Sequence, residues 1–145
     1  MMKIIADSSA NISALEGVCF QSIPMTIRAG EREFVDDGTL DTAKMLDYLA
    51  SYNGKSGTAC PGLDAWLQAF SGADEIFVVT ITGALSGTCA SAVAARDLYL
   101  QSHPEAKIHV FDSLSTGPEM LLLIEKLADL IREGKSFDEI CKAGQ

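Results

Sequence analysis

The chain has 145 residues, of which 48% are hydrophobic, and it carries a formal net charge of −9 at pH 7. This length and composition predict one globular domain with a single hydrophobic core. The excess of acidic side chains argues against nucleic acid as a partner, because few cations are present to neutralise phosphates. No apolar run is long enough to span a bilayer, and the N-terminal residues lack the apolar core of a signal peptide, so we expect a cytoplasmic protein.

The cysteines form neither a disulfide pattern nor a metal-binding pattern. All four are far apart in the sequence, and none belongs to a Cys-x-x-Cys pair: Cys19, Cys60, Cys89 and Cys141. In a reducing compartment, cysteines with this spacing are free thiols. Because the chain has only two histidines, we expect no zinc site and no other metal centre.

The N-terminal third predicts two strands and a hairpin. Residues 3–6 form a short apolar strand, and the sequence DSSAN after it consists of turn-forming and capping side chains. A second apolar segment covers residues 18–29. Residues 25–35 are typical of a β-hairpin with Gly30 at the bend.

Two helices and a loop are predicted next. The first helix follows residue 41 and is capped by Thr39 or by Asp41. Residues 53–57, with the sequence NGKSG, are predicted as a loop. Pro61 suits the first position of the second helix, because a helix does not use the N–H of that residue.

The C-terminal half alternates between strands and helices. Strands are predicted over residues 76–81 and 107–112, and helices over residues 87–100 and 117–133, with a last helix capped by Ser136. The alternation predicts an α/β fold, in which a parallel sheet of about four strands is flanked by helices and accompanied by a small β-hairpin.

A ligand site is expected where the parallel strands end. Ligands of such sheets bind outside the carboxyl ends of the strands. Three hydroxyl-rich loops reach that edge: DSSAN after the first strand, TGALSGT after residues 76–81, and DSLSTG after residues 107–112.

The helix over residues 117–133 has more apolar residues than one buried face requires. The surplus predicts a second buried face, against another domain or another subunit. The sequence also stops within a helical pattern, so we expect the chain to be part of a larger protein.

Ser86, Gly87 and Thr88 mark the start of a helix directly after a strand. The unpaired N–H groups and partial positive charge of a helix N-terminus bind anions without help from Lys or Arg. The two hydroxyls add donors, and the glycine admits a ligand oxygen close to the backbone. The alternative is that Ser86 simply caps the helix.

Three nucleotide or hydrolase motifs do not fit this turn. Gly87 is not followed by the Lys of a phosphate-binding loop, the spacing of Gly83 and Gly87 does not match a dinucleotide fingerprint, and the order around Ser86 is GxxSG rather than GxSxG. His103 and His109 are expected to be structural rather than to serve as a catalytic base. No cofactor is therefore predicted.

Polar residues elsewhere at the same edge have two interpretations each. Thr58 and Cys60 precede a helix start, so they either face the same anion or cap a loop. Asp7 and Asp112 end their strands. They either form a pair of carboxylates for acid–base work or metal binding, or they accept backbone N–H groups of the loops.

Together these stretches resemble the N-terminal domain of the DegV family of bacterial fatty-acid-binding proteins. The similar stretches occur in the family's order and cover nearly the whole chain: Asp7-Ser8-Ser9-Ala10-Asn11, Ile23-Pro24-Met25, Phe34-Val35-Asp36, Thr58-Ala59-Cys60-Pro61-Gly62, Leu85-Ser86-Gly87-Thr88, Ser91-Ala92, and Val110-Phe111-Asp112-Ser113 with Gly117. The chain departs from the family pattern at Thr82-Gly83, where two serines are usual, and at Cys89, where an aromatic residue is frequent.

The resemblance implies a carrier rather than an enzyme. It implies that a long-chain fatty acid is bound with its carboxylate on Thr58, Ser86, Gly87 and Thr88. A surrounding group of side chains is implied as well: Asp7, Ser8, Cys60, Asp112 and Ser113. The implied partner is a separate fatty-acid kinase, which converts the bound acid to an acyl phosphate for phospholipid synthesis.

The resemblance also implies that residues 1–145 are the N-terminal α/β domain, and that a second α/β domain of the family, which covers the lipid, is absent from this chain. A homodimer contact would equally explain the surplus apolar residues of the last long helix. Two other functions remain open from the residues alone. One is a small enzyme acting on a phosphorylated metabolite, and the other is an interaction domain that docks through residues 118–131.

Overall fold

The computed structural model describes residues 1–145 and contains a main sheet of four strands in the order β2-β1-β6-β7. These are β1 (Met2–Asp7), β2 (Cys19–Ile23), β6 (Glu75–Thr80) and β7 (Lys107–Asp112), and all of them are parallel. The two central strands read as almost continuous apolar runs because helices cover both faces of the sheet. The predicted parallel α/β sheet is confirmed.

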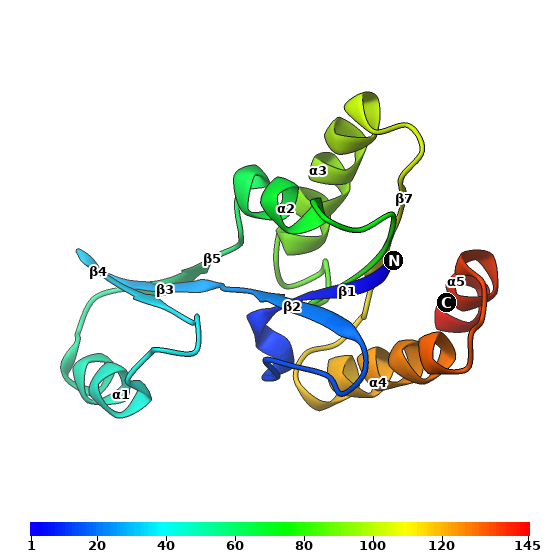
Figure 1. Cartoon of the computed structure of the whole chain (residues 1–145). Coiled ribbons are helices and arrows are strands. Elements are labelled where there is room, and N and C mark those ends of the chain that lie inside the picture. Colours follow the sequence, from blue (N-terminus) through cyan, green and yellow to red (C-terminus); the bar gives the residue numbers. More distant parts are fainter.

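Helices lie on both sides of the main sheet (Figure 1). On one side are α2 (Leu63–Phe70) and α3 (Thr88–Ser102), and on the other are α4 (Pro118–Arg132) and α5 (Phe137–Gly144). Successive strand residues point to opposite faces. Ile5 therefore packs in the core cluster that includes Trp66, while Ile4 packs in the cluster that includes Met120.

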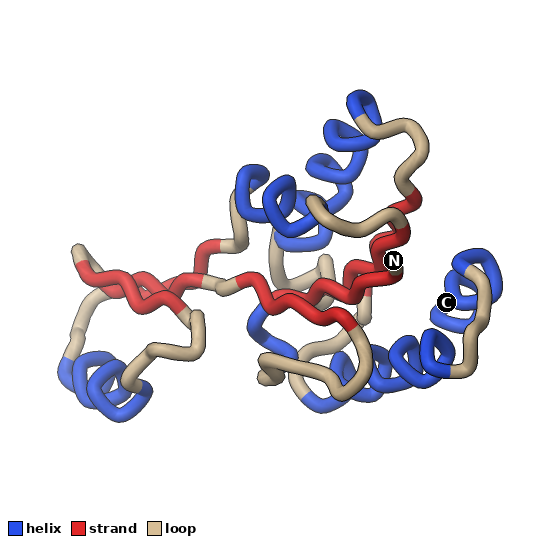
Figure 2. Tube along the Cα trace, in the orientation of Figure 1, coloured by secondary structure: helices blue, strands red, loops and turns tan.

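A second, antiparallel sheet extends to one side of the main sheet (Figures 1 and 2). Its strands are β3 (Thr26–Ala29), β4 (Arg32–Val35) and β5 (Ser56–Ala59), in the order β4-β3-β5, and α1 (Thr42–Ser51) follows β4 in the chain. We call β3, β4, β5 and α1 the arm. The predicted hairpin is confirmed, and Gly30 at its bend has a φ of +63°.

Strand β5 corrects the predicted loop over residues 53–57, because residues 56 and 57 belong to it. Its sequence, Ser-Gly-Thr-Ala, has no strand-forming pattern of its own. The strand exists because β3 pairs with it, with Ile27 opposite Thr58. Thr58 is therefore a strand residue rather than a loop cap.

The helix starts follow the predicted capping rules with one exception. Asp41, not Thr39, caps α1 by accepting a hydrogen bond from Lys44 N at 3.1 Å. Ser136 caps α5, as predicted. Pro61 is not the first residue of α2, because that helix begins at Leu63.

Most of the surplus apolar side chains of α4 are covered within the chain. Leu123, Leu130 and Ile131 are half-buried against the core cluster that includes Met120. Leu122 is the exception, with 66% of its surface exposed. The sequence predicts that another domain or subunit covers a second face of α4, but in the structure the chain itself covers most of that face.

Two further expectations concern the whole chain. All four cysteines are free, as predicted. None of the helices is both long and apolar enough to cross a lipid bilayer.

Candidate functional site

Asp7 at the end of β1 is fully buried, and its carboxylate bonds to two loops. Oδ2 accepts the backbone N–H of Ile81 at 2.7 Å. Oδ1 accepts the N–H of Ser9 at 3.0 Å and also the Ser9 hydroxyl. Oδ1 thus accepts two donors of the protein and Oδ2 accepts one, on a fully buried side chain, which supports a loop-organising role rather than acid–base chemistry.

Ser8 joins the main sheet to the arm. Its side chain is 6% exposed, and its hydroxyl accepts the N–H of Met25 at 2.9 Å. Met25 lies in the short connection between β2 and β3. The hydrogen bond therefore fixes the point where the chain leaves the main sheet.

Asp112 at the end of β7 also accepts backbone N–H groups, although its side chain is exposed. Its carboxylate receives the N–H of Gly83 at 3.2 and 3.1 Å and that of Leu114 at 3.0 Å. The neighbouring Ser113 bonds locally, to the carbonyl of Ser115 at 3.0 Å. Both Asp7 and Asp112 therefore follow the second of their two predicted interpretations.

The predicted anion site lies at the start of α3, where the N-cap residue is Gly87, which has no side chain to cap the helix. The Ser86 hydroxyl accepts the N–H of Thr88 at 3.2 Å, and the two hydroxyl oxygens are 2.8 Å apart. The N–H groups of Cys89 and Ala90 make no hydrogen bond within the protein. We call Ser86, Gly87 and Thr88 with these two free amides the head-group seat.

Exposure differs along the head-group seat. Gly87 is exposed and Ser86 is half-buried, whereas Thr88 is fully buried. Because the Thr88 hydroxyl is paired with Ser86, the exposed donors of the seat are the amides and the side of Ser86 that faces solvent. A ligand oxygen would approach over Gly87.

Cys60 is next to this seat, and Thr58 is further along β5. The sulfur of Cys60 lies 3.7 Å from the point that a Cβ of Gly87 would occupy. The Ser91 hydroxyl donates to the carbonyl of Pro61 at 2.8 Å, which ties the β5–α2 connection to α3. Thr58 is exposed and makes no hydrogen bond with Ser86.

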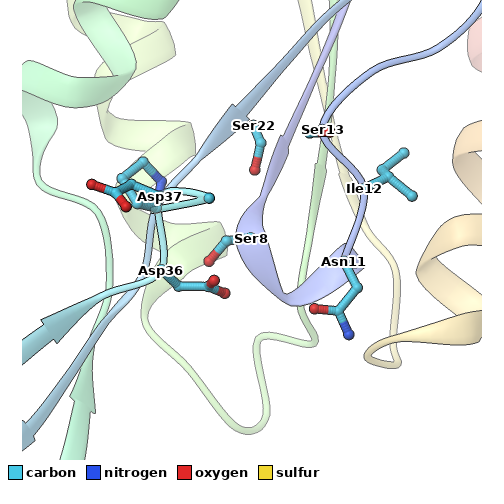
Figure 3. Close-up of a pocket in the computed structure, with 9 residues that line it drawn as sticks. Ser8, Asn11, Ile12, Ser13, Ser22, Asp36 and Asp37 are labelled. Atoms are coloured by element: carbon cyan, nitrogen blue, oxygen red, sulfur yellow. The ribbon is translucent and has the colours of Figure 1, made fainter. Parts of the chain in front are cut away.

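One cavity, the polar cavity, lies between the β1–β2 loop and the β4–α1 loop and has a volume of about 320 Å³. It is lined by Ser8, Asn11, Ile12, Ser13, Ser22, Pro24, Asp36, Asp37 and Gly38. In Figure 3 the Ser8 hydroxyl and the Asp36 carboxylate point toward one another, and Ile12 points away. With two carboxylates and no Lys or Arg in its lining, this cavity repels anions.

A second cavity, the β7 cavity, has a volume of about 620 Å³. It follows β7 past the start of α4 to the end of α5, and it is lined by His109, Val110, Phe111, Asp112, Ser113, Leu114, Glu119, Leu123, Gly144 and Gln145. Leu114 is 79% exposed at its rim and Leu85 is 75% exposed in the loop before the head-group seat. These are the two most exposed large hydrophobic side chains of the chain, and they offer apolar surface to a ligand.

His109 is held neutral within the β7 cavity. Partial burial lowers its pKa, and the positive charge of Arg96 lowers it further. The ring packs edge-on against Phe111, with 4.5 Å between the ring centroids. At neutral pH the imidazole therefore adds no positive charge to the cavity.

The structure brings together only part of the predicted site. Ser86, Gly87, Thr88 and Cys60 are adjacent, and Asp112 is bonded to the same loop at Gly83. Asp7 is also bonded to this loop, at Ile81, whereas Ser8 lies in the 3-10 turn after β1 and Thr58 lies in β5. Sequence reasoning missed the β7 cavity, because its lining comes from β7, α4 and the end of α5, which only the packed fold brings together.

The fold and the site together define an α/β domain with an open helix N-terminus at the carboxyl edge of its sheet. A family model described as "Uncharacterised protein, DegV family" matches residues 1–145. The chain belongs to the DegV family, as its motifs predict.

Solved structures of similar proteins contain fatty acids. A DegV family protein from Eubacterium eligens, loaded with heptadecanoic acid, is 53% identical with a TM-score of 0.97, over 99% of this chain and 52% of that chain. The Fatty Acid Kinase (Fak) B3 protein of Streptococcus pneumoniae, loaded with linoleic acid, is 47% identical with a TM-score of 0.95 and the same coverage.

Curated relatives are similar over the same region. A DegV domain-containing protein of Streptococcus pneumoniae is 48% identical in an alignment 145 residues long, which covers 97% of this chain and 52% of the relative. The chain thus spans about half the length of the curated relatives it matches.

Proposed function

We propose that this chain binds a long-chain fatty acid and holds the carboxylate at the head-group seat. The observation that carries the proposal is the start of α3, where the N–H groups of Cys89 and Ala90 have no partner in the protein. Such donors, aided by the helix dipole, favour a carboxylate. Two relatives near 50% identity contain fatty acids, which supports this class of ligand.

The acyl chain would lie over Leu85 and Leu114 and enter the β7 cavity. The lining of this cavity includes Val110, Phe111 and Leu123 as apolar walls. Each buried methylene contributes about 0.8 kcal/mol, so a chain of about fourteen contributes roughly 11 kcal/mol before ordering costs. The tail would therefore dominate affinity, while the head-group seat selects an acid.

The remaining predicted residues surround this seat. Cys60 packs beside Gly87, and Thr58 would supply a further hydroxyl from β5. Asp7, Ser8, Asp112 and Ser113 hold the loops in place through the hydrogen bonds described above. Because the two aspartates are occupied by backbone amides, they are unsuited to the acid–base role that an enzyme acting on a phosphorylated metabolite requires.

We further propose that the protein is a cytoplasmic carrier that presents the bound acid to a separate fatty-acid kinase. The name of the Streptococcus pneumoniae relative, Fatty Acid Kinase (Fak) B3 protein, supports this partner. A second α/β domain that covers the lipid belongs to the same proposal, and the roughly twofold length of the relatives supports it.

Binding is tested by native mass spectrometry and thermal shift of the delipidated chain with palmitate and oleate. We expect both acids to bind and to raise Tm, and Ser86→Ala to weaken binding about tenfold, as expected for loss of one hydrogen bond to a charged group. Ser102→Ala is the matched control, because this hydroxyl donates to the carbonyl of Tyr99 and otherwise bonds only to Nδ1 of His103, at the other end of α3.

A wild-type chain that takes up neither acid, and that is repeatedly purified free of lipid, would contradict the proposal. A rise of Tm with inorganic phosphate or a sugar phosphate, but with no lipid, would instead favour the enzyme of phosphorylated metabolites.

A further inference from the structure

Asp112 joins the two loops between which the proposed ligand would lie. In the sheet it is paired with Thr80, the last residue of β6. Its carboxylate crosses to the loop after β6 and accepts the N–H of Gly83, three residues before Ser86. It also accepts the N–H of Leu114, which lines the β7 cavity.

The same two loops share another hydrogen bond. The N–H of Thr82 donates to the carbonyl of Ser115 at 2.9 Å. The β6–α3 loop and the β7–α4 loop are thus bonded at Gly83 and at Thr82, and one side chain, Asp112, contributes the first of these links. No other side chain bonds to both loops.

The sequence leaves room for this carboxylate. A Cβ on Gly83 would lie 2.9 Å from Oδ2 of Asp112, so any larger residue at position 83 displaces the side chain. Leu114 has a φ of +57°, which a leucine rarely adopts, and its N–H is the one that Asp112 accepts. The carboxylate therefore helps to hold Leu114 at the cavity rim.

We propose that Asp112 is a positioning residue that couples the head-group seat to the β7 cavity. It acts through Gly83 on the seat and through Leu114 on the rim, and it does not touch the ligand's carboxylate. This inference rests on the proposed function. As a consequence, binding of the acid group and binding of the tail depend on the same side chain. The preference for a free acid over a neutral lipid therefore depends on Asp112.

The ratio of the affinities for palmitate and for its methyl ester distinguishes a positioning role of Asp112 from a general loosening of the fold. We expect Asp112→Ala to weaken palmitate binding about five- to tenfold, and to weaken binding of methyl palmitate, which lacks the charged head group, by a clearly smaller factor, because the ester loses only the support of Leu114 at the rim. Gly83→Ala is expected to act in the same way because it displaces the intact carboxylate. In a Ser86→Ala background the Asp112 substitution should add little further loss, since neighbouring groups that act through one site are not additive.

Asp37→Ala is the matched control. Asp37 accepts the N–H and hydroxyl of the residue two positions later, as Asp112 accepts the N–H of Leu114, but in an exposed loop of the arm. We expect this variant to retain palmitate binding. Amide hydrogen exchange without ligand should show faster exchange at Gly83 and Leu114 in Asp112→Ala and no change there in Asp37→Ala.

The inference is overturned if Asp112→Ala and Asp37→Ala bind palmitate equally well. It is also overturned if palmitate and the methyl ester weaken by the same factor, or if exchange at Gly83 and Leu114 is unchanged. The wild type tests the proposed function separately: binding by the wild type with no effect of Asp112→Ala refutes the coupling alone, whereas a wild type that binds neither palmitate nor oleate refutes both.

Discussion

The polar groups at the carboxyl edge of the main sheet are of two kinds: those that are hydrogen-bonded within the protein and those that have no partner in it. Asp7 accepts hydrogen bonds from Ile81 and Ser9, whereas the amides of Cys89 and Ala90 have no acceptor within the protein. A saturated acceptor stabilises the fold, and a free donor at the surface is available to a ligand. The same edge thus carries both acceptors that organise its loops and donors that the protein leaves free.

Replacing Asp7 by Ala should strongly destabilise the protein. The change leaves the N–H groups of Ile81 and Ser9 without their acceptor in a buried region, and an unsatisfied buried group costs about 1–3 kcal/mol. We expect the free energy of unfolding, measured in urea, to fall by about 2–4 kcal/mol.

Asp37→Ala serves as the control for this substitution. Asp37 makes the same local pair of hydrogen bonds, to the N–H and hydroxyl of Thr39, but it is exposed and makes no long-range bond. Its replacement should change stability by about 0.5 kcal/mol or less. Equal losses in the two variants would show that the long-range bond to Ile81 contributes nothing.

Residue types predicted the site only in part. Ser86-Gly87-Thr88 could be recognised because a strand, a glycine and hydroxyls before a helix have a local physical meaning. The position of Thr58 could not, because it depends on the pairing of β5 with β3. The β7 cavity was also beyond reach, since its walls come from Phe111, Leu123 and Gly144, which only the packed fold brings together.

Among the elements, α5 has the most complete local signal. Ser136 accepts the N–H of Glu139 at 3.3 Å, and Glu139 accepts the N–H of Ser136 at 2.8 Å, which forms a capping box. The backbone N–H of Ser136, and then its side chain, lower the pKa of Glu139 below its ordinary value of 4.5.

The lowered pKa predicts a loss of stability in acid. A carboxylate with a lower pKa in the folded state contributes stability above its unfolded pKa and loses it as the pH falls through the folded value. We expect the wild type to be more stable than Glu139→Gln at neutral pH, and the difference to shrink as the pH falls below about 4.5. Urea unfolding across this range measures it.

The Ser136→Ala background provides the control for this prediction. Ser136→Ala removes only the side-chain half of the capping box, and the N–H of residue 136 still donates to Glu139, so Glu139→Gln should keep most of its effect and of its pH dependence there. A difference between wild type and Glu139→Gln that is constant from neutral to acidic pH would contradict the prediction.

Helices and strands that their own sequence pattern specifies could be predicted, whereas those that form only by pairing with another strand could not. The parallel strands and long helices follow from apolar runs and helical periodicity, and Asp41 and Ser136 follow from capping chemistry. Strand β5 has no such signal, because its backbone pairs with β3 and its side chains contribute little. Pro61 was misplaced for the same reason, since the chain is still leaving β5 at that point.

At the scale of the whole molecule, the main sheet and the arm are two packing units joined by short connections (Figure 2). Ser8 bonds to Met25 within one of these connections. The arm has a small core of its own, in which Phe34 packs against Tyr48 with 5.8 Å between their ring centroids. Its stability is therefore partly independent of the main sheet.

Ser8→Ala should loosen the arm without unfolding the main sheet. The change removes the acceptor of a buried N–H at the joint. We expect amide exchange in β3, β4 and β5 to become about fivefold or more faster, while exchange in β1 and β6 is nearly unchanged.

Ser22→Ala is the control for the joint. Ser22 is half-buried near the same connection and lines the polar cavity, and its side chain makes no hydrogen bond within the protein. We expect exchange in the arm of this variant to resemble that of the wild type. Faster exchange of β1 and β6 together with the arm in Ser8→Ala would show that the two units open as one.

The order of strands in the main sheet also sets the order in which the chain can fold. Strand β1 pairs on one side with β2, which follows it closely, and on the other side with β6, where Met2 lies opposite Glu75. Closing so long a loop costs entropy before its contacts repay it, and such pairings form slowly. During synthesis the backbone edge of β1 that pairs with β6 must wait until β6 has left the ribosome, and until then this edge is open to pairing with another chain.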